Sequence, residues 1–119
     1  MATKSRLRRT ISRWANPDVA EARDLRRTFV TGGVQSIAGA PDRTPVQLRG
    51  TLRTVTLRPR GGVPALEAEL YDGTDTITLI WLGRRRITGI GPGRAIEVSG
   101  RIGVQDGERV LYNPRYELL

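Results

Sequence analysis

The chain has 119 residues, which suits one domain and leaves no room for a second core of ordinary size. Twenty Lys and Arg against twelve Asp and Glu give a formal net charge of +8, and Lys4 is the only lysine. Because guanidinium groups pair with phosphates and stack on bases, this arginine excess predicts attraction to a polyanion. The sequence contains neither Cys nor His, which excludes disulfides, cysteine nucleophiles, the Ser-His-Asp triad and most zinc sites.

The sequence predicts neither a membrane span nor a secretion signal. No apolar run approaches the ~18 residues that cross a bilayer, and arginines interrupt the apolar core that a signal peptide needs. The basic first 15 residues also resemble a transit peptide, but they continue into a capped acidic stretch, which disfavours that interpretation. We therefore expect a cytoplasmic protein with no membrane partner, no cofactor and no bound metal.

Residues 1–31 are predicted to form a basic helical arm. Leu7, Ile11 and Trp14 recur at i, i+4 and i+7, which places them on one stripe of a helix. The run Asn-Pro-Asp at 16–18 then signals a new helix start, with Asn as the cap and Pro in the first turn. Three arginines share another face of the arm and are candidate contacts to the polyanion: Arg6, Arg9 and Arg13.

Two other roles are open to the arm. It could pack Trp14 over an open end of a barrel, or lie on a membrane surface, which the thin apolar stripe disfavours. Residues 32–45 are rich in Gly, Pro and small side chains and are predicted to be a linker.

From residue 46 the hydrophobic period becomes two, which predicts β-strands. In the first strand the phase slips beyond Gly50, as is typical of a bulged, sharply bent strand. Closing the sheet hides both its edges and its apolar face, so we predict a mainly all-β domain over 46–119, a five-stranded closed barrel preceded by the helical arm. The strands are expected at 46–57, 66–71, 75–82, 96–104 and 109–116.

Residues 46–119 resemble an OB-fold, and specifically the wedge-type OB domain of the RecG branch-migrating helicase. The resemblance is carried by VQLRGTL (46–52), ELYDGTDTITLIWL (69–82), PGRAIEVSGRI (92–102) and NPRYEL (113–118). The whole chain is also similar to a family of small stand-alone actinobacterial OB-fold proteins that bind nucleic acid, through LYDGTDTITLIWLGRRRITGI (70–90) and YNPRYEL (112–118). No helicase motor and no phosphate-binding loop of the type GxxxxGK[ST] accompany these segments, so the chain is not expected to be an ATP-driven motor.

The first candidate site is the run Arg84, Arg85 and Arg86, which follows a strand and precedes a Gly-rich loop. Three adjacent guanidinium groups repel one another unless an anion neutralises them, so we interpret the run as a phosphate clamp. The alternative is a set of ion pairs with the acids Glu67, Glu69, Asp72 or Asp75. The neighbouring Gly-rich run 89–93 is not interpreted as a nucleotide loop, because it precedes a strand instead of opening a helix.

The second group of candidates follows the first two strands. Arg58 and Arg60 flank the first loop, which in OB-folds borders the ligand groove. Tyr71 shares the outward phase of its strand and is the stacking candidate, whereas Trp81 is expected in the core. Three further arginines occupy outward strand positions, where each could instead pair with a glutamate: Arg49, Arg53 and Arg101.

Glu67 and Glu69 share the outward face of the second strand with Tyr71 and would repel phosphate there. This favours the loops, the first strand and the arm as the binding surface. We expect a non-enzymatic protein that binds nucleic acid through arginine–phosphate contacts, with low sequence specificity. The resemblance favours single-stranded or branched DNA; RNA, including ribosomal RNA, and a protein-interaction adaptor are the alternatives.

Overall fold

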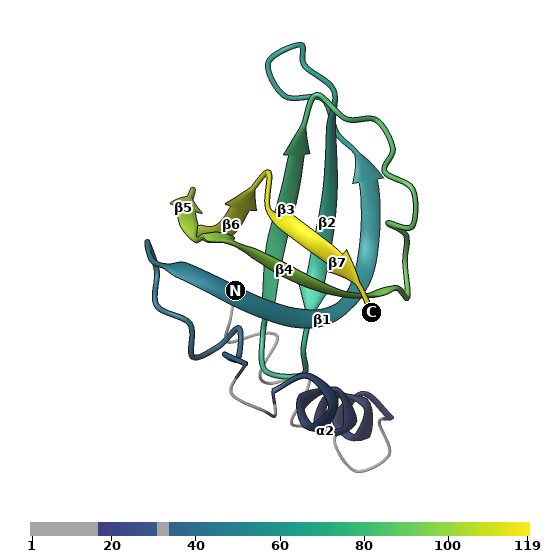
Figure 1. The fold of residues 1–119 in the computed structure, drawn as a ribbon, viewed down its shortest axis with the longest axis vertical. Coiled ribbons are helices and arrows are strands. Elements are labelled where there is room, and N and C mark those ends of the chain that lie inside the picture. Colours follow the sequence, from purple (N-terminus) through teal and green to yellow (C-terminus); the bar gives the residue numbers. More distant parts are fainter. Residues whose placement is uncertain (1–16, 31–33) are drawn as a thin grey trace.

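The computed structural model describes residues 17–30 and 34–119 (Figure 1). One helix, α2, precedes a sheet that contains all seven strands of the described chain (Figure 1). The elements are α2 (Pro17–Phe29), β1 (Pro45–Leu57), β2 (Ala65–Tyr71), β3 (Thr76–Leu82), β4 (Ala95–Arg101), β5 (Gly103–Gln105), β6 (Glu108–Tyr112) and β7 (Arg115–Leu118). No helix among the described residues is both long and apolar enough to cross a membrane.

The strand β1 is long and bent, and it organises the sheet. Its first half, Pro45–Thr51, pairs with β4, and its second half pairs with β2. The register shifts between Leu52 and Thr54, so the predicted bulge is confirmed. Gly50 lies at the bend because a Cβ there would come within 2.6 Å of the carbonyl oxygen of Tyr71.

The predicted five-stranded closed barrel is not what forms. The sheet runs in the order β5-β6-β3-β2-β1-β4-β7, and its hydrogen-bonded ladder ends at β5 and β7. The fourth predicted strand divides at Ile102 into β4 and β5, and the fifth divides at Asn113 and Pro114 into β6 and β7.

The break in the last strand has a physical cause. Asn113 adopts a positive φ of 49°, and Pro114 has no N–H to continue a ladder. The break is fixed by the Asn113 amide, which donates to Ile80 O, and by the Leu82 amide, which donates to Asn113 Oδ1. Before the break β6 pairs in parallel with β3, and after it β7 pairs with β4. The chain at Asn113 and Pro114 therefore crosses from one end of the sheet to the other.

The core fills the space that the bent sheet encloses. Its fully buried side chains include Leu48, Leu70, Leu79 and Val98, which come from four different strands. Trp81 is also buried, as predicted, and its Nε1 donates to Pro114 O at 3.1 Å. Residues 83–94 between β3 and β4 form turns without a helix, and they close one side of the core with two buried isoleucines, Ile87 and Ile90.

The core also extends upstream of Val46, into the segment that was expected to be a linker. Ile37 is fully buried and Ala40 nearly so. The Ile37 amide donates to Oδ2 of the buried Asp72, and Arg109 donates to the carbonyl oxygens of Ile37 and Ala40. Arg109 Nε also lies 2.9 Å from Asp42 Oδ1, so this segment is fastened at both ends.

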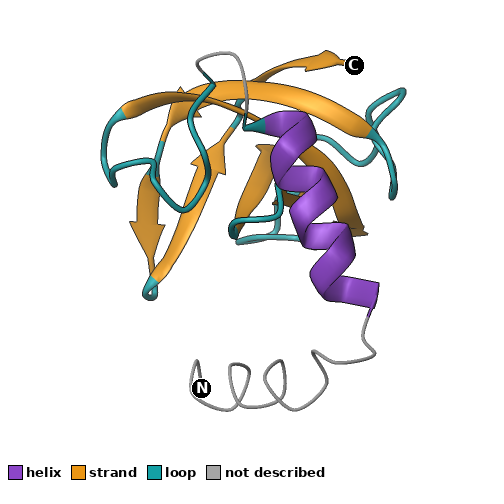
Figure 2. Cartoon of the chain, turned by 90° about the horizontal axis from the view of Figure 1, so that it is seen from below, coloured by secondary structure: helices purple, strands orange, loops and turns teal. Residues whose placement is uncertain are grey.

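The helix α2 lies across the end of the sheet where β2 turns into β3 (Figure 2). The contact is made by backbone: a Cβ on Gly73 would collide with the carbonyl oxygen of Ala22 and come within 2.7 Å of the Arg26 nitrogen. Gly73 also has a positive φ of 92°, so the turn and the helix contact both require glycine here. Phe29, at the end of α2, is buried.

Candidate nucleic-acid interface

The outward side chains of β1, β2, β3 and β6 share one face of the sheet, called here the outer face. Two of them, Ile80 and Val110, are buried with Ala65 in a small second cluster. Cross-strand register places Thr56, Glu67, Ile80 and Tyr112 in one row. The next row holds Thr54, Glu69, Thr78 and Val110. The loop β1–β2 and the turn β5–β6 border this surface.

The arginines of the loop β1–β2 converge on Glu67. Arg60 Nη2 lies 3.0 Å from Glu67 Oε2, and Arg58 Nη1 lies 3.9 Å from Oε1. The hydrogen bond to Glu67 raises the pKa of Arg60, and Asp106 in the turn β5–β6 adds a smaller effect in the same direction. Two guanidinium groups thus face one carboxylate, so the repulsion of phosphate that the sequence suggested for Glu67 is offset.

Arg53 and Tyr71 come together on the outer face. The guanidinium carbon of Arg53 lies 3.6 Å from the centroid of the Tyr71 ring, which is a cation–π stack. The two residues are neighbours because the bulge leaves Arg53 without a partner on β2, and Tyr71 pairs with Thr51, one position before the last pair that precedes the bulge.

Tyr112 was not singled out from the sequence, yet it lies on the outer face and is 41% exposed. Its hydroxyl donates to Oε1 of Gln105 across the turn β5–β6. The parallel pairing of β6 with β3 brings it beside Ile80. A pairing between strands so far apart in the chain leaves no local signal in the sequence.

Arg84, Arg85 and Arg86 are all exposed on the segment that follows β3. None of them forms an ion pair within residues 17–30 and 34–119. Two of the acids proposed as their alternative partners are engaged elsewhere, since Glu67 pairs with Arg58 and Arg60, and Asp72 accepts backbone amides. The other two, Glu69 and Asp75, form no ion pair with these arginines. The described part of the chain therefore leaves this charge uncompensated.

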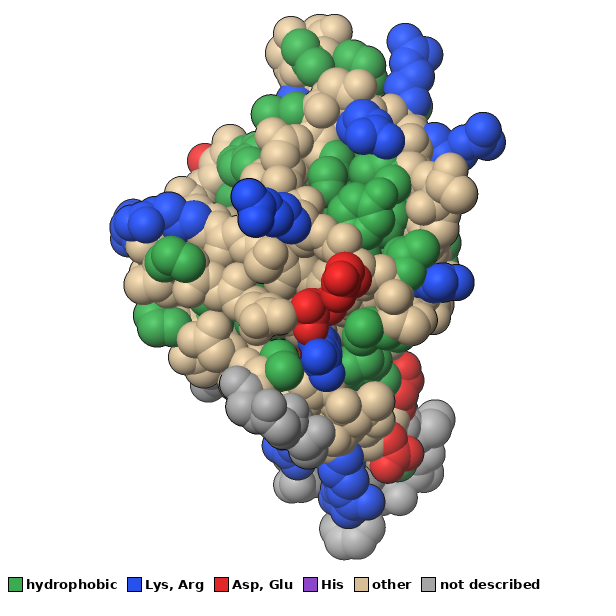
Figure 3. All heavy atoms as spheres, viewed as in Figure 1, with side chains coloured by type: hydrophobic (Ala, Val, Ile, Leu, Met, Phe, Trp, Pro, Cys, Tyr) green, Lys and Arg blue, Asp and Glu red, His purple; other side chains and the backbone are tan. Residues whose placement is uncertain are grey.

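The other two strand candidates, Arg49 and Arg101, lie on another surface, formed by the outward sides of β4, β7 and the first half of β1, Pro45–Thr51 (Figure 3). Arg49 Nε is bonded to Glu97 Oε1 at 2.6 Å, and Gln47 donates to the other carboxylate oxygen. Glu97 also pairs in register with Glu117, so two acids stand side by side here. Arg49 is thus a cross-strand partner, and Arg101 on the same side stands opposite Pro45, at the end of β1 that does not pair with β2.

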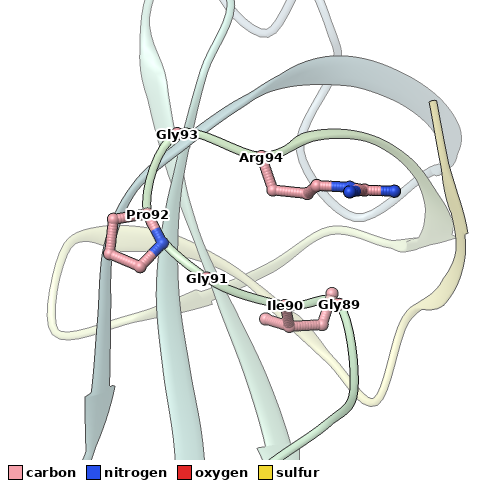
Figure 4. A pocket seen from close by; sticks show the side chains of 6 residues that line it. All are labelled: Gly89, Ile90, Gly91, Pro92, Gly93 and Arg94. Carbon is pink, nitrogen blue, oxygen red and sulfur yellow. The ribbon is translucent and has the colours of Figure 1, made fainter.

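A shallow hollow is lined by Gly89–Arg94 (Figure 4). Its backbone donors are largely used: Ile90 N donates to Ile87 O, Gly93 N to Leu52 O and Arg94 N to Gly91 O. Pro92 has none. This geometry agrees with the prediction that the run is not a nucleotide-binding loop.

Two other kinds of candidate, the arm arginines and a metal site, belong to neither of these surfaces. The arm arginines Arg6, Arg9 and Arg13 lie outside the described residues. Among the residues that are described, no group of three metal-ligating side chains is placed to hold an ion.

The bent first strand, the Greek-key order of the sheet and the bordering loops define an OB-fold, and solved structures share it. The chain is similar to one chain of a replication protein A heterotrimer bound to ssDNA, at 14% identity and a TM-score of 0.52, over 71% of this chain and 63% of that one. It is also similar to the second OB-fold domain of replication protein A from Methanococcus maripaludis, at 12% identity and a TM-score of 0.55, over 71% and 93%. No protein-family model matches the sequence, and no curated protein is similar to it.

The predicted OB-fold is therefore confirmed, with seven strands in place of five. The resemblance to the RecG wedge domain and to the actinobacterial family stays a prediction.

Proposed function

We propose that this protein binds single-stranded nucleic acid on the outer face, with DNA favoured over RNA and with little sequence specificity. One observation carries the proposal: two arginines, Arg58 and Arg60, share a single carboxylate on the same face of the sheet as exposed Tyr112 and the Arg53–Tyr71 stack. Proteins that bind single strands combine positive charge along the path of the phosphate backbone with planar side chains on which bases stack.

The fold supports the same assignment. In OB-folds the surface of the second and third strands, between the loops that correspond to β1–β2 and β5–β6 here, binds oligonucleotides. The two similar structures come from replication protein A, one of them bound to ssDNA. Arg84, Arg85 and Arg86 would add phosphate contacts at the end of β3.

Binding of labelled oligonucleotides of about 16 nucleotides tests the proposal, since one OB-fold covers ~4–16 nucleotides. We expect single-stranded DNA to bind more tightly than matched duplex, and log affinity to fall linearly with log salt concentration. A forked DNA and a single-stranded RNA of the same sequence decide between the alternatives. Duplex binding equal to single-strand binding, or no binding of any nucleic acid, would contradict the proposal.

A pair of variants locates the surface. Arg58→Ala should weaken single-strand binding and flatten the salt plot by about 0.7, the contribution of one phosphate contact. Arg101→Ala changes the net charge by the same amount on the other surface and should leave the slope unchanged. Equal effects from the two variants would show that net charge, and not the outer face, determines binding.

We also propose that the protein has no catalytic activity of its own, since it lacks His, Cys and a nucleotide loop. Purified protein should show no ATPase, nuclease or strand-separating turnover. Turnover that disappears with a single substitution would contradict this.

A further inference from the structure

Arg53 owes its position to the bulge in β1. Leu52 pairs with Leu70 and Thr54 with Glu69, so Arg53 is the extra residue of the bulge and has no partner on β2. The central carbon of its guanidinium lies over the Tyr71 ring, 3.6 Å from the ring centroid. A phenol ring and a guanidinium are both planar, and this separation is well within that of a cation–π contact.

This stack changes which surface is open to a ligand. One face of the Tyr71 ring is covered, and Tyr71 is only partly exposed. Arg53 is exposed and has no acidic partner within the described residues. The side of its guanidinium that faces away from Tyr71 is therefore a flat, cationic surface supported from beneath by an aromatic ring.

We propose that the Arg53–Tyr71 stack is the seat of one unpaired nucleobase, which stacks on the open face of the guanidinium. The assignment rests on the proposed function and deepens it, because a base can occupy this seat only when it is free of a duplex. Arginine planes accept bases in the same way as aromatic rings, and the aromatic support keeps the plane oriented without a bound ligand.

The surroundings suit the phosphates on either side of such a base. The turn after β2 meets α2 at Gly73, two residues from Tyr71, and the last turn of α2 carries the exposed Arg26 and Arg27. In the other direction along the β1–β2 hairpin lie Arg58 and Arg60. Positive charge thus flanks the seat on both sides, while Arg53 presents its plane to the base.

The competing role for Arg53 is an ordinary phosphate contact, and Arg53→Lys separates the two. Lysine keeps the charge but loses the planar group. We expect this variant to bind a single-stranded DNA of about 16 nucleotides at least fivefold more weakly, as loss of one stacked base predicts. The slope of log affinity against log salt should stay that of the wild type, because the charge is unchanged.

An abasic strand of the same length provides the decisive comparison. Because it has phosphates but no bases, wild type and Arg53→Lys should bind it equally. Tyr71→Leu should weaken binding of the normal strand as Arg53→Lys does, and the double variant should lose no more than either single one, since both remove the same stack. Arg101→Lys is the matched control and should bind like the wild type, and thermal melts confirm that each variant is folded.

The inference is overturned if Arg53→Lys binds the normal strand like the wild type, or if it loses affinity equally for normal and abasic strands. In either case the wild type still binds, and the proposed function stands. If the wild type binds neither strand, the proposed function fails and the nucleobase seat fails with it.

Discussion

The side chain of Glu97 makes the stability of the folded state depend on pH. Its hydrogen bonds with Arg49, and then with Gln47, lower its pKa below the ordinary value of 4.5. The ionised form is therefore favoured in the folded state. Its contribution to stability is fully present above the unfolded pKa and is lost as the pH falls through the lower, folded pKa.

We predict that Glu97→Gln lowers the free energy of unfolding by about 1 kcal/mol at pH 7, because Glu97 is largely buried but Arg49 is not. The difference from wild type should shrink as the pH falls below the ordinary value of 4.5 and through the lower, folded pKa of Glu97, because the wild-type carboxylate then becomes protonated too. Denaturant unfolding of both proteins at several pH values measures this difference in the free energy of unfolding.

Glu117→Gln is the control for that experiment. Glu117 stands opposite Glu97 in the register and has no ion pair in the described residues. Removing its charge relieves a like-charge pair, so stability at pH 7 should stay the same or rise slightly. A Glu97→Gln deficit that stays unchanged down to the lowest pH at which the protein is folded would show that its cause is packing and not charge.

The sequence identified Arg53 and Tyr71 separately but not their contact. The phase slip after Gly50 predicts a bulge, and Tyr71 has the outward phase, yet neither pattern says which side chain the extra residue will cover. That depends on the register between β1 and β2, which involves residues about twenty positions apart. Arg58 and Arg60 were correctly placed beside the first loop, but their shared carboxylate depends on the same register.

At the level of elements, the segment that follows β3 carries three consecutive exposed arginines that have no ion pair in the described chain. We predict that replacing Arg84, Arg85 and Arg86 together by Ala weakens single-strand binding for unrelated sequences alike. The slope of the salt plot should fall by ~2, which is three contacts at ~0.7 each. The melting temperature should stay the same, because no acidic partner is lost.

Replacing the same three residues by Lys is the matched control. It preserves the charges, so the salt slope should remain that of the wild type. If the alanine variant keeps the wild-type slope, these arginines do not contact phosphate, and if it melts at a lower temperature, they have structural partners outside the described residues.

The strands themselves were largely predictable, because alternation of apolar side chains reports which face is buried. All five predicted strands are present within a few residues of their expected bounds. Their division into seven was not foreseen, since alternation continues through Ile102 and Tyr112 although the ladder does not. The conformation of Asn113 and the bonds to Ile80 and Leu82 that fix it belong to the tertiary structure.

For the whole molecule, the question is where the folded unit begins. Residues 1–16 contain five basic and no acidic residues and none of the described core. We predict that a variant lacking residues 1–16 keeps the circular dichroism and melting temperature of the full chain but binds nucleic acid more weakly. Unchanged affinity would remove Arg6, Arg9 and Arg13 from the binding surface.

A second variant, lacking residues 1–30, is its comparison. This cut removes α2 and with it buried Phe29, so it should melt at a lower temperature while keeping its β-sheet spectrum. Loss of a buried Phe side chain alone costs roughly 3–5 kcal/mol in other proteins. If the two variants melt together, α2 contributes nothing to the stability of the sheet.

The start of the folded unit was the least predictable feature. Ile37 is a single large apolar residue in a run of small ones, so no periodicity marks it as core. Its burial depends on Asp72 and Arg109, which lie 35 and 72 positions further along the chain. Contacts between residues so far apart in the chain cannot be predicted from local sequence patterns.

Gly73 has a consequence for the comparison of related sequences. Because the backbone of α2 occupies the place where a side chain would stand, the helix and a larger residue at this position exclude one another. A relative that has any other amino acid here must have moved the helix or lost it. When homologous chains are aligned, this single column should therefore separate those that inherited the docked helix from those that kept only the sheet.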